Sequence, residues 1–211
     1  MAPMSRQLRY LTPLMLIAVP VLAQVSWTPV FDSADYAAAS SVNFNSVAYG
    51  NGLWVAVGYV PNEGGMIFRS ENGTDWSRVT QAEWGIANPR QPGKLPDARR
   101  VEFVNDRFFV LGPWAYDGDA LLLSSANGLG WQAHSWNGID NYYTTSGLRA
   151  ITYGEGIYLL SAGPLLYSSS DLANWTEVEN PPETGWVWQD VAYGFGRFGA
   201  VGFTVNASHD A

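Results

Sequence analysis

A twelve-residue phrase occurs four times in this chain, and it limits the fold more than any other feature. The copies are V-A-Y-G-N-G-L-W-V-A-V-G from Val47, V-E-F-V-N-D-R-F-F-V-L-G from Val101, I-T-Y-G-E-G-I-Y-L-L-S-A from Ile151 and V-A-Y-G-F-G-R-F-G-A-V-G from Val191. A second phrase, a Ser followed by Asn or Asp and then by Trp, comes after each of the first three copies. Because the two phrases recur in fixed order at a period of about 40–55 residues, we expect a repeat protein.

Each repeat reads as a four-stranded antiparallel meander. In the first copy, the short β runs Val47–Tyr49 and Leu53–Val57 flank an Asn-Gly pair. Both residues of such a pair tolerate the positive φ angles that a type I′ hairpin needs. The runs Met66–Arg69 and Trp76–Val79 supply the third and fourth strands, on either side of the second phrase.

Sheets of this kind are apolar on both faces and must stack on their neighbours, which predicts an all-β protein. Radial stacking of four-stranded sheets is the β-propeller. We expect blades near residues 45–79, 99–133, 149–178 and 187–211. A β-sandwich is the alternative, but it gives no reason for two phrases to recur in fixed order.

The second phrase resembles the Asp-box, the bacterial neuraminidase repeat of sialidase-like β-propellers. Its residues here are Ser70, Asn72, Gly73 and Trp76, then Ser125, Asn127, Gly128 and Trp131, then Ser169, Asp171 and Trp175, with Leu172 in place of the third glycine. The resemblance implies that the box lies on the rim between the third and fourth strands, remote from the ligand-binding axis. We therefore expect structural roles, with the Asn or Asp bonded to backbone amides and the Trp as an apolar wedge on the outer strand.

The two ends of the chain leave the number of blades open. Ser208–Ala211 reads as the start of a box, and Val25–Val30, with Trp27, resembles the strand that follows a box. Either the chain is a fragment of a propeller of six to eight blades, or the strand around Trp27 closes a four-bladed ring. The interrupted box favours the fragment.

The N-terminus reads as an export signal over residues 1–23. Arg6 and Arg9 precede an apolar run from Leu11 to Leu22, which is shorter than a membrane-spanning helix, and Ala23 completes a small-residue cleavage site. A short membrane anchor is the alternative. The chain has no cysteine, so export without disulfides favours a secreted or periplasmic protein of a bacterial envelope.

The charge balance bears on partners. With 19 acidic and 11 basic residues, the formal net charge is −8, which argues against nucleic acid and anionic membranes. We expect no cofactor and no metal site, because Asp117-Gly-Asp119 lacks the spaced ligands of a calcium loop and fits an ordinary turn. The expected partner is a glycan or another envelope protein.

Aromatic and acidic residues gather in the long loops expected on one face of the propeller. Flat rings beside carboxylates suit carbohydrate, because sugar faces pack on rings while hydroxyls need polar partners. The candidate ligand-binding residues there are Trp114, Tyr116, Asp117, Asp119, Trp136, Tyr142 and Tyr143, and the same set of loops holds Trp84, Trp186 and Trp188. The alternative is that these rings fill gaps between blades.

Aligned copies place a polar residue two positions before each inner strand's first apolar residue. These residues are Asn45, Arg99, Arg149 and Gln189, and equivalent positions are expected to ring the channel mouth. Arg99 and Arg149 are therefore candidates for binding a carboxylate or sulfate. The alternative is pairing with loop acids such as Asp97 or Asp140.

Glu102 departs from the small residues at the equivalent positions of the other copies. Because an acid on an inner strand is costly to bury unpaired, we expect it to face the channel or to pair with Arg100 or Arg149.

No catalytic set emerges from these residues, which favours a non-catalytic recognition or scaffold module with carbohydrate as the candidate ligand. The alternative is a fragment of a sialidase-like glycoside hydrolase. That resemblance implies an Arg cluster, a Phe/Tyr-Arg-Ile-Pro motif, a Tyr nucleophile with a Glu partner and an Asp acid/base. The Arg-Ile-Pro motif is absent, and the sequence nominates no Tyr/Glu pair.

Overall fold

The structure is a computed structural model that describes residues 43–60, 64–84, 97–112, 121–134, 147–179 and 186–204. The predicted export signal, the strand around Trp27 and the interrupted box at Ser208–Ala211 lie outside these ranges. Within the described ranges, no helix is long and apolar enough to cross a membrane.

Within these ranges, fourteen strands form four antiparallel sheets, three of four strands and one of two. The first sheet holds β1 (Asn43–Gly50), β2 (Leu53–Val60), β3 (Gly64–Ser70) and β4 (Ser77–Arg78). The second holds β5 (Arg100–Val104), β6 (Arg107–Gly112), β7 (Leu121–Ser125) and β8 (Gln132–Ala133). The third holds β9 (Leu148–Gly154), β10 (Ile157–Ala162), β11 (Leu165–Ser169) and β12 (Thr176–Val178). The fourth holds β13 (Trp186–Gly194) and β14 (Arg197–Thr204).

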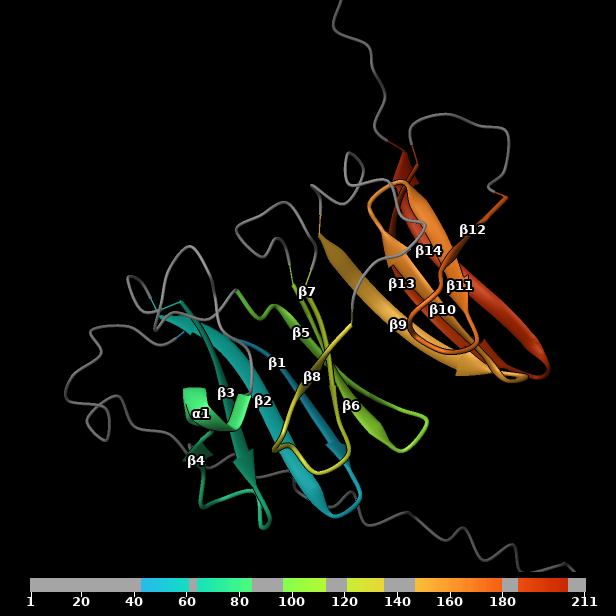
Figure 1. Ribbon diagram of the computed structural model, residues 1–211. Coiled ribbons are helices and arrows are strands. Elements are labelled where there is room, and N and C mark those ends of the chain that lie inside the picture. The colour runs from blue at the N-terminus through green and yellow to red at the C-terminus, as the bar shows by residue number, and fades with distance from the viewer. Residues whose placement is uncertain are drawn as a thin grey trace, which may run out of the picture.

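The sheets stand face to face like the blades of a propeller (Figure 1). The inner strands β1, β5, β9 and β13 neighbour one another in that order, and each sheet continues outward as a meander. The predicted all-β propeller fold is therefore confirmed. The first and fourth sheets lie at opposite ends of the described arc (Figure 1).

The hairpins between inner and second strands have the turn geometry that the first phrase predicts. Asn51 and Gly52 take φ angles of 49° and 75°, as a type I′ turn requires. Glu155 and Phe195, at the same place in later copies, also adopt positive φ, at 52° and 51°. The repeat position therefore imposes the left-handed conformation even where the residue is neither Asn nor Gly.

Three apolar cores fill the spaces between successive sheets. Val55 and Ile67 of the first sheet meet Phe108 and Val110 of the second. Two further cores join the second sheet to the third and the third to the fourth. Each sheet is thus stabilised by burial against its neighbours, as expected for strands that are apolar on both faces.

Each box tryptophan lies one residue before its outer strand, and Trp131 and Trp175 lie between two described blades. Trp131 and Trp175 are only 4% exposed and belong to the cores that join their own sheet to the preceding one. Trp76 of the first sheet is half-buried, against a small cluster around Met66 and Phe68 on the sheet's outer face. The difference follows from position, because no described sheet precedes the first.

The box turns are closed by side-chain to backbone hydrogen bonds. Asn72 Oδ1 accepts the N–H groups of Thr74 and Asp75, at 2.9 and 2.8 Å. Asp171 Oδ1 does the same for Ala173 and Asn174 in the third box, at 2.9 and 2.8 Å. These bonds hold the acceptor at the centre of the turn.

Leu172 occupies the glycine position of the third box. It adopts φ 64°, close to the 78° and 71° of Gly73 and Gly128, and its side chain is buried in the core between the second and third sheets. Burial of this side chain offsets the backbone strain of the left-handed conformation.

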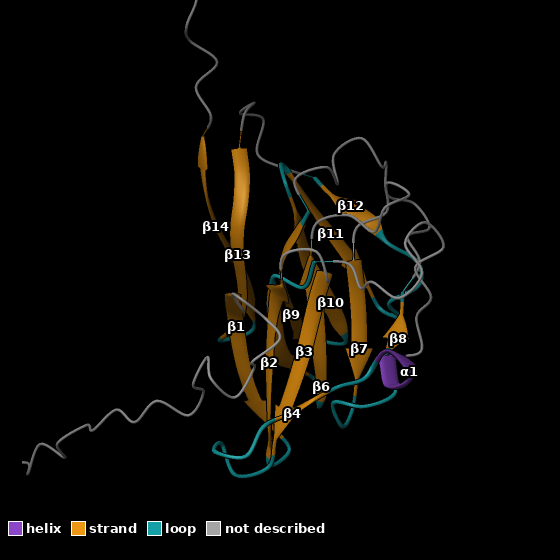
Figure 2. Ribbon diagram, turned by 90° about the vertical axis from the view of Figure 1, so that its left-hand side faces the viewer, coloured by secondary structure: helices purple, strands orange, loops and turns teal. Residues whose placement is uncertain are grey.

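The single described helix, α1 (Gln81–Trp84), is one short turn that follows the first sheet (Figure 2). Glu83 accepts the backbone and hydroxyl hydrogens of Thr80, at 2.6 and 2.7 Å, in a capping arrangement that lowers the pKa of Glu83. Trp84 is fully buried in the core between the first and second sheets.

Candidate functional site

The four aligned polar positions turn out to be β-bulges. In β1, β9 and β13 the pairing register skips Asn45, Arg149 and Gln189. In β5, Arg99 donates its backbone N–H to Leu111 O at 2.9 Å, while the next residue also pairs with Leu111. A bulge removes one residue from the ladder and re-aims its side chain, which explains why this position is polar in every copy.

In three of the four copies, the first phrase ends in a glycine that makes room for the bulge. A Cβ on Gly112 would lie 2.0 Å from the backbone oxygen of Asp97, and the equivalent clashes at Gly58 and Gly202 would be at 2.3 and 2.5 Å. The third copy has Ala162 at this position. The glycine is visible in the repeated phrase, but only the pairing register of the strands shows that it lies opposite a bulge.

Bulge side chains bind the neighbouring sheet. Asn45 Nδ2 donates to Ala98 O at 3.1 Å, from the first sheet to the segment before β5. Arg149 Nη1 donates to Gln189 Oε1 at 2.8 Å, from the third sheet to the fourth. Arg149 therefore pairs with the amide of another bulge residue, and Asp140 lies outside the described residues.

Two of the bulge side chains have a buried nitrogen without a hydrogen-bond partner among the described protein atoms. Arg149 Nε and Gln189 Nε2 are buried donors with no hydrogen-bond partner among the protein atoms around these described strands. Buried donors in folded proteins are paired in the great majority of cases, so these two nitrogens depart from the usual pattern.

A hollow of about 520 Å³ lies where the first two sheets meet at their bulges, and five polar or aromatic residues line it: Asn43, Asn45, Tyr59, Asp97 and Arg99. Arg99 is exposed, so its guanidinium is available. Burial raises the pKa of Asp97, and the charge of Arg99 partly opposes that shift.

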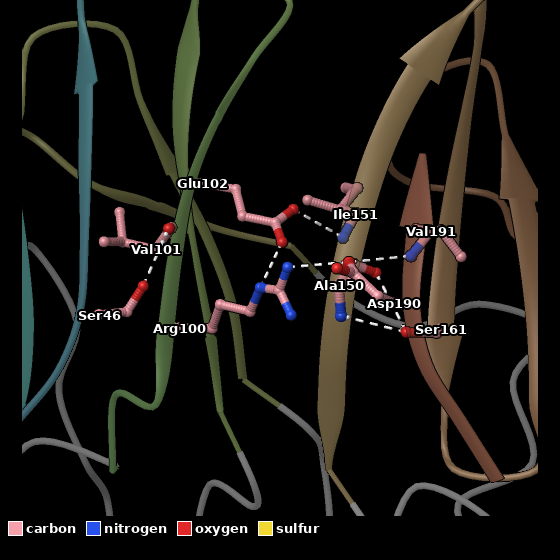
Figure 3. Close-up of polar contacts among 9 residues, drawn as sticks. All are labelled: Ser46, Arg100, Val101, Glu102, Ala150, Ile151, Ser161, Asp190 and Val191. Carbon is pink, nitrogen blue, oxygen red and sulfur yellow. Dashed lines mark hydrogen bonds and ion pairs between the residues drawn. The ribbon is translucent and has the colours of Figure 1, made fainter. Parts of the chain in front are cut away.

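Deeper along the inner strands lies a charged cluster (Figure 3). Glu102 accepts the backbone N–H of Ile151 at 2.9 Å and forms an ion pair with Arg100. Arg100 Nη2 also donates to Asp190 Oδ1 at 2.8 Å. Glu102 thus adopts one of the two arrangements expected from sequence, its pairing with Arg100. Asp190 also belongs to the cluster, and no sequence pattern singles it out.

The Glu102 side chain is 15% exposed, and burial raises the pKa of its carboxyl group. The Ile151 N–H and the Arg100 charge act in the opposite direction, and the charge of Asp190 adds to the rise. The cluster joins the second, third and fourth sheets into one polar unit, because its three contacts come from β5, β9 and β13.

A Tyr/Glu pair that the sequence did not nominate lies at the far end of these strands. Tyr193 donates its hydroxyl to Glu155 Oε1 at 2.6 Å, which raises the pKa of Tyr193. Arg149 and Glu155 are at opposite ends of β9, roughly 20 Å apart at the usual rise per residue. The pair therefore does not lie with the arginines, as a sialidase-type nucleophile would need.

The loop residues predicted to bind ligand lie outside the described residues: Trp114, Tyr116, Asp117, Asp119, Trp136, Tyr142 and Tyr143. The three other loop aromatics are described, and all of them fill gaps between sheets. Trp186 and Trp188 belong to β13, not to a loop, and stack on each other with ring centroids 5.5 Å apart. For these two residues and Trp84, the gap-filling interpretation is correct.

His134 faces Ser124, with its Nε2 2.8 Å from Ser124 Oγ, but the serine is buried and the pair lies at an outer strand. Burial lowers the pKa of His134. No group of three metal-ligating side chains occurs within the ranges that the structure describes.

No sequence family and no curated protein matches this chain. Among solved structures it is similar to one from the GH130 family, whose glycoside hydrolases target β-1,2-mannosidic linkages in Candida mannan, with TM-score 0.47, 14% identity and coverage of 81% of this chain and 62% of that one. The chain is also similar to a glycosyl hydrolase from Bacteroides ovatus, with TM-score 0.47, 16% identity and coverage of 81% of this chain and 62% of that one. The computationally designed Ika4 protein is similar with TM-score 0.45 and 11% identity, over 75% of this chain and 90% of that one.

The chain thus spans 62% of the length of the two glycosidase-like structures. The fold rests on this chain's own strands, turns and cores.

Proposed function

We propose that this chain is an exported, non-catalytic β-propeller module that recognises an acidic carbohydrate at the bulge end of its inner strands. The observation that carries the proposal is the set of bulge residues, Asn45, Arg99, Arg149 and Gln189, which presents polar side chains at the same place in all four sheets. We also propose that the chain is part of a longer propeller of six to eight blades.

The hollow between the first two sheets supports a sugar acid as the ligand class. The exposed Arg99 supplies a planar fork for a carboxylate or sulfate. Tyr59 offers a ring for a sugar face, and Asn43 and Asn45 offer amides for hydroxyl groups.

Recognition without cleavage is the proposed role of the bulge residues, and the described acids farther along the inner strands have other partners. Glu102 is committed to Arg100 and to the Ile151 amide, and the Tyr193–Glu155 pair lies at the opposite end of the strands.

A glycan array containing sialylated, uronic-acid, sulfated and neutral sugars tests the proposal. We expect binding to acidic glycans, lost on Arg99→Ala and retained on Arg78→Ala, an exposed arginine of the outer strand β4. Equal binding by both variants, or binding to neutral glycans alone, would contradict the proposal. Release of free sugar from a bound glycan would contradict its non-catalytic part.

A further inference from the structure

The hollow at the bulges of the first two sheets contains an acid and a base two residues apart. Asp97 and Arg99 both line it, and Ala98 between them is fully buried in the core that joins the two sheets. Asp97 is half-buried, whereas Arg99 is exposed. A ligand acid that reaches this arginine therefore also comes close to the carboxyl group of Asp97.

The backbone of this short segment is held from both sides. Asn45 Nδ2 of the first sheet donates to Ala98 O at 3.1 Å, and the backbone N–H of Arg99 donates to β6 at 2.9 Å. Gly112 of β6 passes so close to the backbone oxygen of Asp97 that an added Cβ would lie 2.0 Å from it. The acid and the base therefore keep fixed places on the wall of the hollow.

The charge of Arg99 acts on Asp97 without a direct ion pair. No ion pair of the described residues joins the two side chains. Burial raises the pKa of Asp97, because loss of water favours the neutral carboxyl group, and the arginine partly opposes this shift. Asp97 thus takes up a proton at a less acidic pH than an exposed aspartate does, and Arg99 then has no opposing charge beside it.

The other groups around Asp97 carry no charge. β1 contributes Asn43 and Asn45 to the walls of the hollow, β2 contributes Tyr59, and β6 contributes Gly112 beside the backbone of Asp97. Amides do not titrate, and a phenol is neutral in acid. Among the described residues that line the hollow, Asp97 is therefore the group whose charge responds to acid.

We propose that Asp97 competes with the acidic ligand for Arg99, so that the hollow binds acidic sugars more tightly in acid than at neutral pH. This regulation rests on the proposed function. At neutral pH the Asp97 carboxylate repels a ligand carboxylate or sulfate and offsets the attraction of Arg99. In acid the repulsion is gone, and the Asp97 hydroxyl becomes a hydrogen-bond donor. By linkage, the ligand favours the protonated form of Asp97 to the same extent, so ligand and proton bind together.

A sulfated sugar is the suitable probe, because a sulfate ester keeps its charge in acid. We expect glucose 6-sulfate to bind the full chain about tenfold more tightly at pH 3.8 than at pH 7, since one pKa unit of coupling corresponds to about tenfold in affinity. Far-UV spectra establish that the chain is folded at both pH values. Glucose, which has no charge, is the control ligand.

The variant Asp97→Asn imitates the protonated acid. We expect it to bind glucose 6-sulfate at pH 7 about as tightly as the wild type does in acid, with no further change on acidification. Glu177→Gln removes the same charge from an exposed position on β12, so it should keep the pH dependence of the wild type. Calorimetry in buffers of different ionisation enthalpy should show proton uptake on binding by the wild type and none by Asp97→Asn.

The results separate this regulation from the recognition on which it rests. Binding by the wild type that is equal at both pH values, and no tighter in Asp97→Asn, would overturn the regulation and leave recognition intact. Weaker binding by Asp97→Asn at pH 7 would also overturn it, because Asp97 would then hold the ligand. No binding by any of these proteins at either pH would contradict the proposed function itself.

Discussion

Arg100 and Asp190 form an ion pair between the inner strands of the second and fourth sheets, with 2.8 Å between Nη2 and Oδ1. The third sheet's inner strand lies between them, and it passes this point with Ala150, which is buried and small. Glu102 holds the same guanidinium from the other side (Figure 3). One arginine therefore neutralises two acids on two different blades.

Removing this arginine should destabilise the protein more than removing the outer acid. Asp190 is half exposed, so Asp190→Asn should cost about 1 kcal/mol or less, as exposed ion pairs do. Arg100→Met leaves the buried Glu102 uncompensated and should cost on the order of 2 kcal/mol, below the range of fully buried pairs. Urea unfolding of both variants at neutral pH measures the difference, and equal costs would mean that Glu102 is not held by Arg100.

The raised pKa of Glu102 gives stability a distinct pH dependence. The folded protein holds this proton more tightly than the unfolded chain, so its contribution is present below pH 4.5 and is lost as pH rises through the folded pKa. Glu102→Gln should remove that loss while keeping an acceptor for the Ile151 N–H. Unfolding free energies from pH 4.5 upward should diverge between wild type and variant, with the exposed Glu177→Gln as control. Parallel curves would show that the carboxyl group titrates normally.

The box residue Asp171 should give stability the opposite pH dependence. Hydrogen bonds from Asn174 and Ala173 lower the pKa of Asp171, so its contribution is present above pH 3.8 and is lost as pH falls through the folded value. Asp171→Asn keeps the acceptor oxygen, as Asn72 and Asn127 do in the other boxes, and should flatten acid unfolding. Asp171→Ala should be less stable across the whole pH range. Acid titration monitored by tryptophan fluorescence separates these outcomes.

The box tryptophans should differ in their contribution to stability. Trp131→Ala and Trp175→Ala should each cost about 3–5 kcal/mol, because both rings fill a core between sheets. Trp76→Ala should cost less, since its ring is only half-buried. Denaturant midpoints of the three variants provide the measurement, and an equal cost at all three positions would show that packing between sheets does not set the value.

Gly112, opposite the bulge of β5, should be intolerant of even one methyl group, whereas the third sheet has Ala162 at the equivalent position. Gly112→Ala places a Cβ against a backbone oxygen and should cost about 1–3 kcal/mol, as overpacking does. Gly199→Ala on the equivalent strand of the fourth sheet meets nothing within 4 Å and should be close to neutral. Thermal unfolding of this matched pair tests whether the glycine serves the bulge.

The repeated phrases were sufficient to predict the described sheets and turns, because short apolar β runs and Asn-Gly pairs act locally. They also placed Asn45, Arg99, Arg149 and Gln189 at one level. The phrases could not reveal that these four residues lie at β-bulges, since a bulge depends on the register between two paired strands. Arg100 and Asp190 meet across 90 residues, and no local pattern encodes their approach.

The roles of the loop aromatics could not be predicted from the sequence either. A tryptophan in a long polar stretch reads equally as a ligand platform or as a wedge, because its large apolar surface suits either role. Trp84 is buried by the two sheets that its own segment connects, and Trp188 by the sheet before it. Only the arrangement of the sheets decides between the two roles.

Every described strand pairs only with its immediate neighbour in sequence. Such pairing between strands adjacent in sequence keeps the entropic cost of closing each sheet small. Each meander is therefore able to form as it leaves the ribosome and to use the previous one as its template. The Arg100–Asp190 bond, which needs three sheets in place, is then among the last contacts to form and marks the completion of the arc.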